Sequence, residues 1–119
     1  MRVVVPKEIK DGEKRVALVP DVINKLTRLG FDVVIESGAG SHSQAVDAEY
    51  KAAGAMISDG EVLSTADAVL SVQPLTPAQM SKLKKGAITI SFLSPVTAVD
   101  SIDAAASAGV TAFSLELVP

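Results

Sequence analysis

The sequence predicts an α/β fold in which an open, mostly parallel sheet carries helices on both faces. Short apolar runs rich in β-branched residues recur along the 119 residues, and stretches with helical spacing lie between them. This alternation is typical of parallel α/β layers. The runs are apolar almost throughout, which favours strands that are covered on both sides. With three Phe, one Tyr and no Trp in the chain, the core is expected to consist of Val, Ile, Leu and Ala.

The first strand is expected at residues 3–5, and the first helix begins after Pro20. Its apolar stripe comprises Val22, Ile23, Leu26 and Leu29, and Gly30 follows as a left-handed stop. Further strands are predicted at 32–36, 55–58 and 68–72, separated by short helices at 47–53 and 59–65. Together with two later strands at 87–92 and 110–114, these elements favour one flavodoxin-like domain spanning residues 1–119.

The helix before residue 87 is marked by its ends. Thr76-Pro77-Ala78-Gln79 has the form of a capping box with proline at the first helical position, and Met80 and Leu83 are expected to face inward. A cluster of three lysines precedes Gly86, and we place it in the last turn, where cations suit the helix dipole, rather than in a phosphate site. These lysines are Lys82, Lys84 and Lys85.

The last helix is predicted at about 97–108, with Gly109 as its stop. We expect Val99, Ile102 and Ala106 on its buried face. Ligands of open parallel sheets bind at the carboxyl ends of the strands, so the loop that follows Glu116 is predicted to be functional. We expect that loop, and a further domain after it, to lie beyond Pro119.

Composition excludes several classes of function. The net charge of −3 is spread over both signs, which argues against a nucleic-acid-binding surface and against a polybasic membrane anchor. The absence of cysteine excludes disulfides and thiol chemistry and favours a cytoplasmic setting. No segment approaches the roughly 18 to 20 apolar residues that a membrane-spanning helix needs.

Gly38-Ala39-Gly40 follows a predicted strand, as a dinucleotide-binding fingerprint would. Ser43 stands where that fingerprint needs a third glycine, and the residues after Gly40 do not predict an immediate helix. Asp59 follows these glycines at about the sequence spacing of the acidic residue that contacts the ribose in such fingerprints. We nevertheless interpret the glycines as a turn, and we assign no cofactor-binding residue.

Arg15 is the one candidate substrate-binding residue. It lies between the first strand and the first helix, where its guanidinium could hold a carboxylate or phosphate; the alternative is an ion pair with Glu13 or Glu8. His42 lies alone among serines, and Asp100 and Asp103 are interpreted as charges of the last helix. Ser91, Ser94, Ser101 and Ser107 fit no nucleophile elbow. No catalytic or metal-binding residue is assigned.

Several segments together resemble the N-terminal region shared by alanine dehydrogenases and the alpha subunits of proton-translocating NAD(P) transhydrogenases. They are Arg2-Val3-Val4-Val5-Pro6-Lys7-Glu8, Glu13-Lys14-Arg15-Val16-Ala17-Leu18-Val19-Pro20, Glu36-Ser37-Gly38-Ala39-Gly40, Glu49-Tyr50 and Ala53-Gly54-Ala55. The resemblance runs the full length of the chain, in the right order and spacing.

Two positions favour the transhydrogenase. The dehydrogenases hold their keto acid with an arginine, a lysine and a catalytic histidine in this region. Arg15 matches the arginine, but Gln73 aligns with the lysine and Ser94 with the histidine. An amide and a hydroxyl cannot supply the cation and the proton donor that reductive amination needs. Ser91-Phe92-Leu93-Ser94-Pro95 looks like the transhydrogenase version of the segment.

The resemblance implies that this domain packs against a downstream Rossmann domain that binds NAD(H), within a subunit expected to be a dimer. That subunit would pass hydride from NADH to NADP⁺ on a separate component, coupled to proton movement through a membrane component. We expect a cytoplasmic domain attached to the membrane complex by other components, and no tight NAD(H) binding by this chain alone. An alanine dehydrogenase-like domain with altered substrate residues, and a non-catalytic α/β binding module, remain as alternatives.

Overall fold

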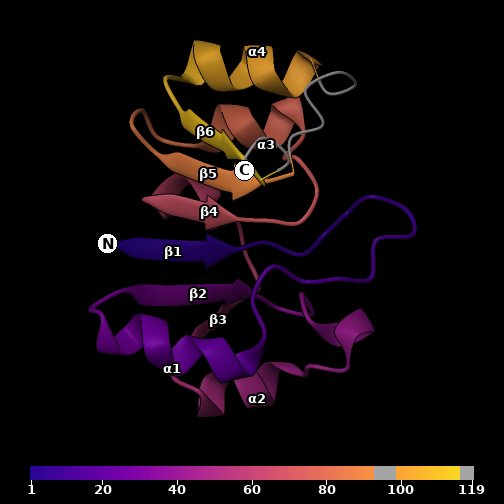
Figure 1. The fold of residues 1–119 in the computed structure, drawn as a ribbon, viewed down its shortest axis with the longest axis vertical. Helices are drawn as coiled ribbons and strands as arrows, with labels where there is room; N and C mark the ends of the chain where they lie inside the picture. The colour runs from indigo at the N-terminus through magenta and orange to yellow at the C-terminus, as the bar shows by residue number, and fades with distance from the viewer. Residues whose placement is uncertain (93–98, 116–119) are drawn as a thin grey trace.

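A six-stranded, all-parallel sheet forms the centre of the computed structural model, which describes residues 1–92 and 99–115 (Figure 1). The strands are β1 (Arg2–Val5), β2 (Asp32–Glu36), β3 (Met56–Ser58), β4 (Ala68–Leu70), β5 (Ile88–Ser91) and β6 (Thr111–Ser114). The helices are α1 (Pro20–Arg28), α2 (Asp47–Ala52), α3 (Pro77–Lys82) and α4 (Val99–Ala108), with 3₁₀ turns η1 (Ser41–Ser43) and η2 (Leu63–Thr65). The predicted α/β class with a parallel sheet is confirmed.

The strand order is β3-β2-β1-β4-β5-β6. This is the order 3-2-1-4-5-6 of the classic doubly wound sheet, and it differs from the predicted flavodoxin-like order 2-1-3-4-5 by the additional outer strand β3. From β1 the chain runs outward to β2 and β3, and then returns to β4 on the other side of β1. The direction of winding therefore reverses between β1 and β4, which pair through Val3 with Ala68 and Val4 with Val69. Figure 1 shows the carboxyl ends of the strands together, with the loop after β1 extending from that edge.

Two apolar clusters cover opposite faces of the sheet, as the alternation of side chains along each strand requires. Val4, Val34 and Val69 belong to the cluster that includes residues of η2, α3 and α4. Val5, Val33 and Ile35 belong to the cluster with α1 and α2. The prediction that helices cover both faces is confirmed for the described residues.

The capping box of α3 is present as predicted. The backbone N–H of Gln79 donates to Thr76 Oγ1 at 3.2 Å, and the Gln79 side chain accepts from the Thr76 N–H at 2.9 Å. The helix nevertheless ends at Lys82, so only that lysine lies in the last turn. Placing Lys84 and Lys85 there was wrong. Instead, Lys84 Nζ forms an ion pair with Asp67 at 2.6 Å, which joins the segment before β5 to the residue before β4.

Three further predictions of helical structure were wrong in detail. The helix expected at 59–65 is only the 3₁₀ turn η2, because Glu61 and Ser64 satisfy the local backbone through a side-chain turn. Leu29, expected in the stripe of α1, is 73% exposed at the helix end. On α4 the buried residues are Ser101 and Ala105, whereas Val99 is 53% exposed, so the predicted face is rotated. The start predicted for this helix, at residue 97, lies outside the described residues.

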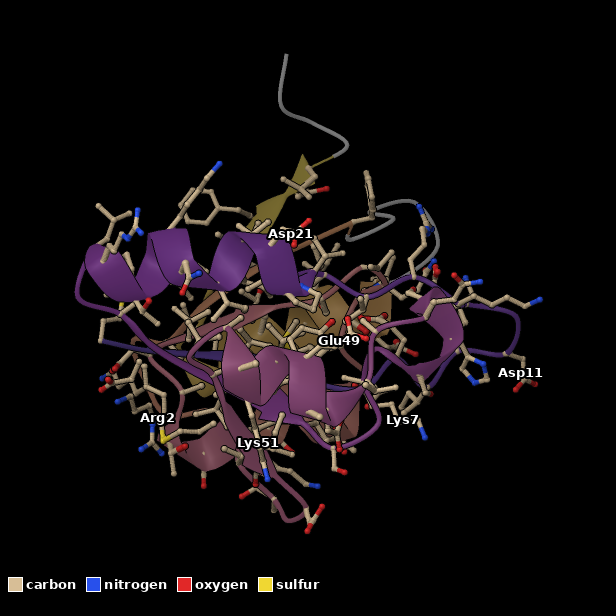
Figure 2. The ribbon with its side chains drawn as sticks, turned by 90° about the horizontal axis from the view of Figure 1, so that it is seen from below. Arg2, Lys7, Asp11, Asp21, Glu49 and Lys51 are labelled. Carbon is tan, nitrogen blue, oxygen red and sulfur yellow. The ribbon has the colours of Figure 1, made fainter. Side chains whose placement is uncertain are left out.

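The side of the domain that carries α1 and α2 presents charged residues to solvent. Figure 2 views the molecule from this side, with Glu49 and Lys51 on α2; both are exposed. Among the helices of residues 1–92 and 99–115, none has the length and apolar character needed to cross a membrane.

Candidate functional site

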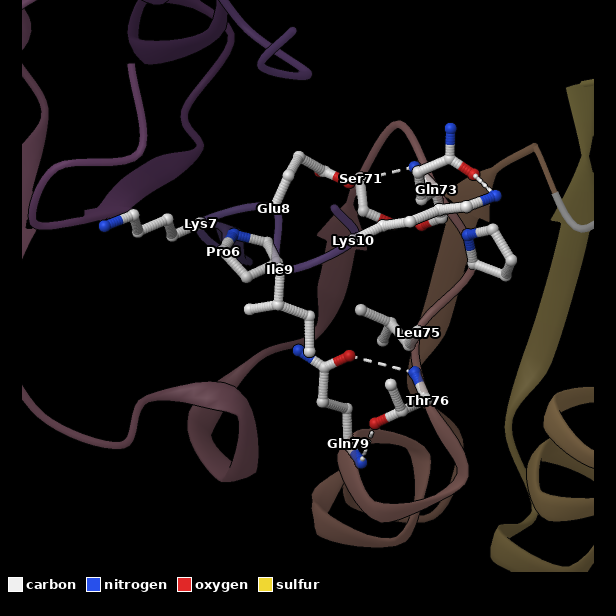
Figure 3. A pocket seen from close by; sticks show the side chains of 11 residues that line it. Pro6, Lys7, Glu8, Ile9, Lys10, Ser71, Gln73, Leu75, Thr76 and Gln79 are labelled. Carbon is white, nitrogen blue, oxygen red and sulfur yellow. Dashed lines mark hydrogen bonds between the residues drawn. The ribbon is translucent and has the colours of Figure 1, made fainter. Parts of the chain in front are cut away.

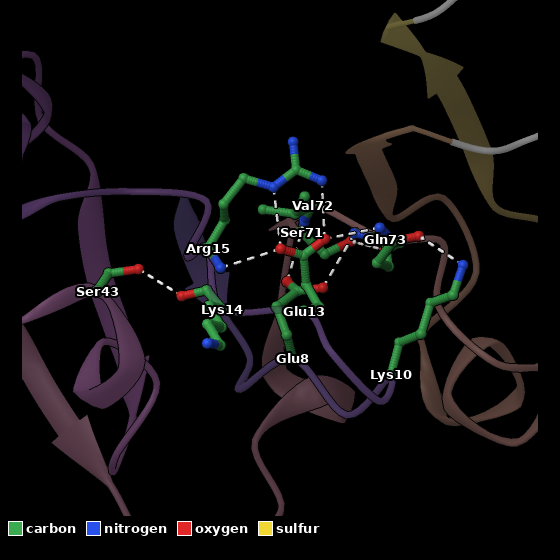
Figure 4. Close-up of polar contacts among 9 residues, drawn as sticks. All are labelled: Glu8, Lys10, Glu13, Lys14, Arg15, Ser43, Ser71, Val72 and Gln73. Carbon is green, nitrogen blue, oxygen red and sulfur yellow. Dashed lines mark hydrogen bonds and ion pairs between the residues drawn. The ribbon is translucent and has the colours of Figure 1, made fainter.

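The reversal of winding between β1 and β4 brings two loops together at the carboxyl edge of the sheet. One loop is residues 6–19, after β1, and the other is residues 71–76, after β4. In open α/β sheets this point is where ligands bind, because the loops of the neighbouring strands diverge and leave a crevice. The polar contacts between these loops therefore define the candidate site (Figure 4).

Glu8 joins the two loops. Its carboxylate accepts hydrogen bonds from the backbone N–H groups of Val72 and Gln73, both at 2.9 Å. Val72 is 9% exposed, so its N–H would be costly to leave without a partner. Glu8 thus fixes the position of the loop after β4 relative to the loop after β1.

A chain of polar side chains crosses the same edge. Arg15 donates to both oxygens of Glu13, at 2.9 Å from Nε and 2.8 Å from NH2, and Gln73 Nε2 donates to Glu13 at 2.7 Å. Beyond Gln73, Lys10 Nζ donates to its side-chain oxygen at 3.4 Å. Hydrogen bonds from Arg15 and then from Gln73 lower the pKa of Glu13 from 4.5 to about 2. Glu13 is therefore ionised at neutral pH and holds both neighbours.

The ion pair with Glu13 that the sequence offered as the alternative for Arg15 is present. This ion pair leaves part of the guanidinium accessible to a ligand, because the Arg15 side chain is 63% exposed, whereas the Glu13 side chain is 6% exposed. Arg15 also lines a pocket of about 390 Å³ with Val16, Ala17, Ile90 and Phe92. The geometry thus places Arg15 at a cleft and tethers it there. Whether it binds a ligand stays a prediction.

A second pocket, of about 520 Å³, lies between residues 6–10 and the start of α3 (Figure 3). Ser71 lines this pocket and the Arg15 pocket, so the two adjoin. Gln73 and Glu8 also line it. This pocket was not predicted from the sequence, because its walls come from segments more than 60 residues apart, as the separation of Glu8 from Gln73 illustrates.

The loop after β1 is tied down on the α2 side as well. The Tyr50 hydroxyl donates to the carbonyl oxygen of Leu18 at 2.6 Å, and the Tyr50 side chain is fully buried. Ser43 donates to the carbonyl oxygen of Lys14 at 2.5 Å. These contacts, from residues 29 and 32 positions away in sequence, hold the segment that carries Arg15.

The turn at Gly38-Ala39-Gly40 does not fit the pyrophosphate of a dinucleotide. The Gly38 N–H donates to Asp47 at 2.9 Å, and Ser37 donates to the same carboxylate at 2.7 Å. These two bonds lower the pKa of Asp47, so an anion already occupies the donors that a phosphate would need. Gly38 has φ +79°, and a Cβ on Gly40 would lie 2.6 Å from the Ala45 oxygen. Both glycines are therefore required by the local backbone.

Other candidates occupy ordinary surroundings. His42 is exposed, and no group of three or more metal-ligating side chains occurs within residues 1–92 and 99–115. Asp100 lies in the first turn of α4, as predicted. Residues 93–95 lie outside the described residues. They include Ser94, on which the distinction between alanine dehydrogenases and transhydrogenases partly depends. The loop after Glu116 also lies outside the described residues.

A profile of the family described as "Alanine dehydrogenase/PNT, N-terminal domain" matches residues 4–119. The chain belongs to this family. The match covers the described loops that carry Glu8, Glu13, Arg15 and Gln73. It confirms the resemblance that the sequence motifs indicated.

Relatives of both kinds occur at similar identity. The chain is 37% identical to an NAD(P) transhydrogenase alpha subunit of Rhodospirillum rubrum, over 100% of this chain and 33% of the relative. It is 38% identical to alanine dehydrogenase of Mycobacterium tuberculosis, over 99% of this chain and 32% of the relative. The chain thus spans about a third of the length of these relatives, and identity alone does not separate the two activities.

Solved structures of the same two kinds of enzyme also match this chain. A transhydrogenase from Sinorhizobium meliloti matches with a TM-score of 0.95 and 39% identity, over 100% of this chain and 36% of that chain. An L-alanine dehydrogenase matches with a TM-score of 0.89 and 30% identity, over 96% of this chain and 32% of that chain. The backbone described above is therefore the family's N-terminal domain.

Proposed function

We propose that this chain is the N-terminal domain of the NAD(H)-binding alpha subunit of a proton-translocating NAD(P) transhydrogenase. The complete enzyme would transfer hydride from NADH to NADP⁺, coupled to proton movement across a membrane. The domain would sit beside a downstream dinucleotide-binding domain in a dimeric subunit, and the NADP-binding and membrane components would be separate partners. The domain itself would be cytoplasmic and reach the membrane through those components.

The hydrogen bonds of the Gln73 side chain are the main support for this proposal. Its amide nitrogen donates to Glu13 at 2.7 Å and its amide oxygen accepts from Lys10 at 3.4 Å, so both ends of the amide suit their partners. Keto-acid chemistry would require a cation at this position, next to Arg15, to hold a substrate carboxylate. The amide of Gln73 is not itself a cation, and Ser94, which aligns with the catalytic histidine of the dehydrogenases, does not replace their proton donor.

The chain's role in hydride transfer would be positional. NAD(H) would be held elsewhere in the subunit, since the glycine turn of this chain does not fit its pyrophosphate. When bound, that cofactor supplies the hydride. Direct transfer between two nicotinamides needs apposed rings and exclusion of water rather than acid or base groups. We expect the Arg15 pocket, with Phe92 at its rim, to contribute one wall of the cleft where this exclusion occurs.

Alanine dehydrogenase remains the second candidate, because Arg15 is exposed at a pocket and the mycobacterial relative is as similar as the transhydrogenase one. The test compares two activities of the complete subunit. With its partner components, it should transfer hydride from NADH to an NADP⁺ analogue. Alone, it should not oxidise NADH in the presence of pyruvate and ammonium. Pyruvate-dependent oxidation without transhydrogenation would reverse the assignment.

A substitution sharpens this test. Changing Gln73→Lys places a cation between Glu13 and Lys10, and should reduce hydride transfer by disturbing the loop. It should not create pyruvate-dependent oxidation, because the proton donor is still missing. A substitution of matched chemistry on the outer surface, Gln44→Lys in the exposed turn after η1, serves as the control.

A further inference from the structure

We propose that the pocket between residues 6–10 and α3, here called the α3 pocket, is a binding site for a small monocarboxylate with a short apolar chain. The site is separate from the Arg15 pocket, and the inference does not rest on the proposed function. The α3 pocket has a volume of about 520 Å³, which lies within the range of small-molecule sites.

The walls of the α3 pocket favour an apolar ligand body. Four of its lining residues are Pro6, Ile9, Pro74 and Leu75. Pro6 and Leu75 are buried at its base, whereas Ile9 is 63% exposed at the tip of the loop. A ligand between Ile9 and Leu75 would remove the Ile9 side chain from water, and Figure 3 shows these two side chains on either side of the pocket.

One cation is available at the opposite end. Lys10 makes no ion pair among residues 1–92 and 99–115, and its contact with Gln73, at 3.4 Å, is at the long end for a hydrogen bond. Lys7 points away from the pocket in Figure 3, and its Nζ lies near Gly38. A ligand carboxylate would therefore meet Lys10, which would exchange a weak bond to an amide for a charged one.

The charge of the pocket limits the ligand to a single negative charge. Glu8 lines the same pocket, and its carboxylate is held in place by the N–H groups of Val72 and Gln73. A phosphate dianion would meet one cation and one fixed anion, and its oxygens would face the apolar wall. A carboxylate with an apolar tail of a few carbons matches both ends.

Gln73 connects the α3 pocket to the Arg15 pocket. Its amide oxygen contacts Lys10 and its amide nitrogen contacts Glu13, which in turn holds Arg15. Among residues 1–92 and 99–115, a carboxylate that draws Lys10 away from Gln73 would leave the contact with Glu13 as the only side-chain hydrogen bond of this amide. Ligand binding in the α3 pocket is thus expected to change the hydrogen bonding of Gln73, although the ligand does not contact Arg15.

The test uses hexanoate as the probe. Hexanol, which has the apolar chain but no carboxylate, and inorganic phosphate, which has negative charge but no apolar chain, serve as comparisons. Each is titrated into the 119-residue chain while backbone amide shifts are followed by NMR. Hexanoate should produce saturable shifts at Ile9, Leu75 and Gln73, with weaker effects at Val16 and Ala17 in the Arg15 pocket. Hexanol and phosphate should bind at least several-fold more weakly.

Two variants test whether Lys10 binds the carboxylate of the ligand. Lys10→Gln should weaken hexanoate binding about fivefold, as expected for a partly exposed ion pair. Lys14→Gln makes the same change of charge in the same loop, outside the pocket lining, and should leave binding unchanged. Equal weakening by both variants would mean that only net charge matters and would overturn the site.

Other results also contradict the proposal. Absence of saturable shifts up to roughly 50 mM hexanoate, where even a weak site with a millimolar constant would fill, would exclude a small-molecule site and leave the groove to a protein segment. Shifts centred on Val16 and Ala17 would move the ligand to the Arg15 pocket. Phosphate that binds as tightly as hexanoate would contradict the ligand class.

Discussion

Replacing Glu8 by glutamine should destabilise the domain and loosen the loop after β4. In the structure the Glu8 carboxylate accepts two backbone hydrogen bonds, each of 2.9 Å, from residues 64 and 65 positions away. A glutamine keeps one acceptor oxygen but turns an NH₂ group toward the second N–H, so one charged hydrogen bond is lost and the other becomes neutral. Hydrogen bonds to charged groups contribute about 1.5–3 kcal/mol each, so we expect a loss of about 2–3 kcal/mol.

This loss is large enough to measure in two ways. Over a domain of 119 residues it corresponds to a fall in melting temperature of roughly 10 °C. Urea unfolding should show a lower midpoint with an unchanged slope, since the surface exposed on unfolding is the same. Amide hydrogen exchange should accelerate most at Val72 and Gln73, because one of these two donors loses its partner and the other keeps only a neutral hydrogen bond.

The control is Glu49→Gln on α2, which removes a carboxylate that is exposed, whereas Glu8 is half-buried, and that forms no side-chain hydrogen bond within the described residues. It should cost only a few tenths of a kcal/mol through the helix dipole. If Glu8→Gln were as mild as this control, or if exchange at Val72 and Gln73 did not change, Glu8 would not hold the two loops together and the reasoning would fail.

Three further changes probe the local structure. Gly40→Ala should destabilise the chain by more than about 2 kcal/mol, because its Cβ would lie 2.6 Å from the Ala45 oxygen, whereas Gly60→Ala, in open space, should be nearly neutral; comparable melting temperatures would refute the close packing. Glu13 has a pKa of about 2, below its usual 4.5, so its contribution to stability is present above about pH 4.5 and is lost as pH falls toward 2. Urea unfolding of Glu13→Gln across this range should therefore show a flatter acid dependence than the unaltered chain, and parallel curves would contradict the bonding around Glu13. Thr89→Val should leave stability unchanged or raise it by up to about 1 kcal/mol, because the buried hydroxyl of Thr89 has no partner in the described part of the chain; a clear loss in a thermal melt would show that it does have one.

The layered fold could be predicted from the sequence because its signals are local. Apolar runs such as Asp32–Glu36 coincide with a strand, and the capping box of Thr76 and Gln79 forms as its residue types require. Errors occurred where tertiary contacts override local patterns. Lys84 fits a helix end in sequence but pairs with Asp67, and the buried face of α4 is set by its packing on α3 and β6 rather than by its most apolar residues.

The candidate site was predicted only in part. Arg15 stood out because of its position between the first strand and the first helix, and the structure places it at a pocket. The contacts of Glu8 with Val72 and Gln73 left no trace in the sequence, because they join segments that approach each other only when β1 and β4 pair. The hydrogen bond from Tyr50 on α2 to Leu18 in the loop after β1 was likewise not predicted. Such contacts depend on the strand order, which the residues alone did not give.

The most direct test of the assignment is a calorimetric titration of NADH into this 119-residue chain beside the same titration into the complete subunit. Protein concentrations should be high enough to detect dissociation constants of a few hundred micromolar, about 5 kcal/mol of binding free energy. We expect saturable heat for the complete subunit and none for the chain alone, because Asp47 occupies the donors of its glycine turn. Saturable binding by the chain alone would contradict the assignment of nucleotide binding to the rest of the subunit and would identify Gly38–Gly40 as a nucleotide site.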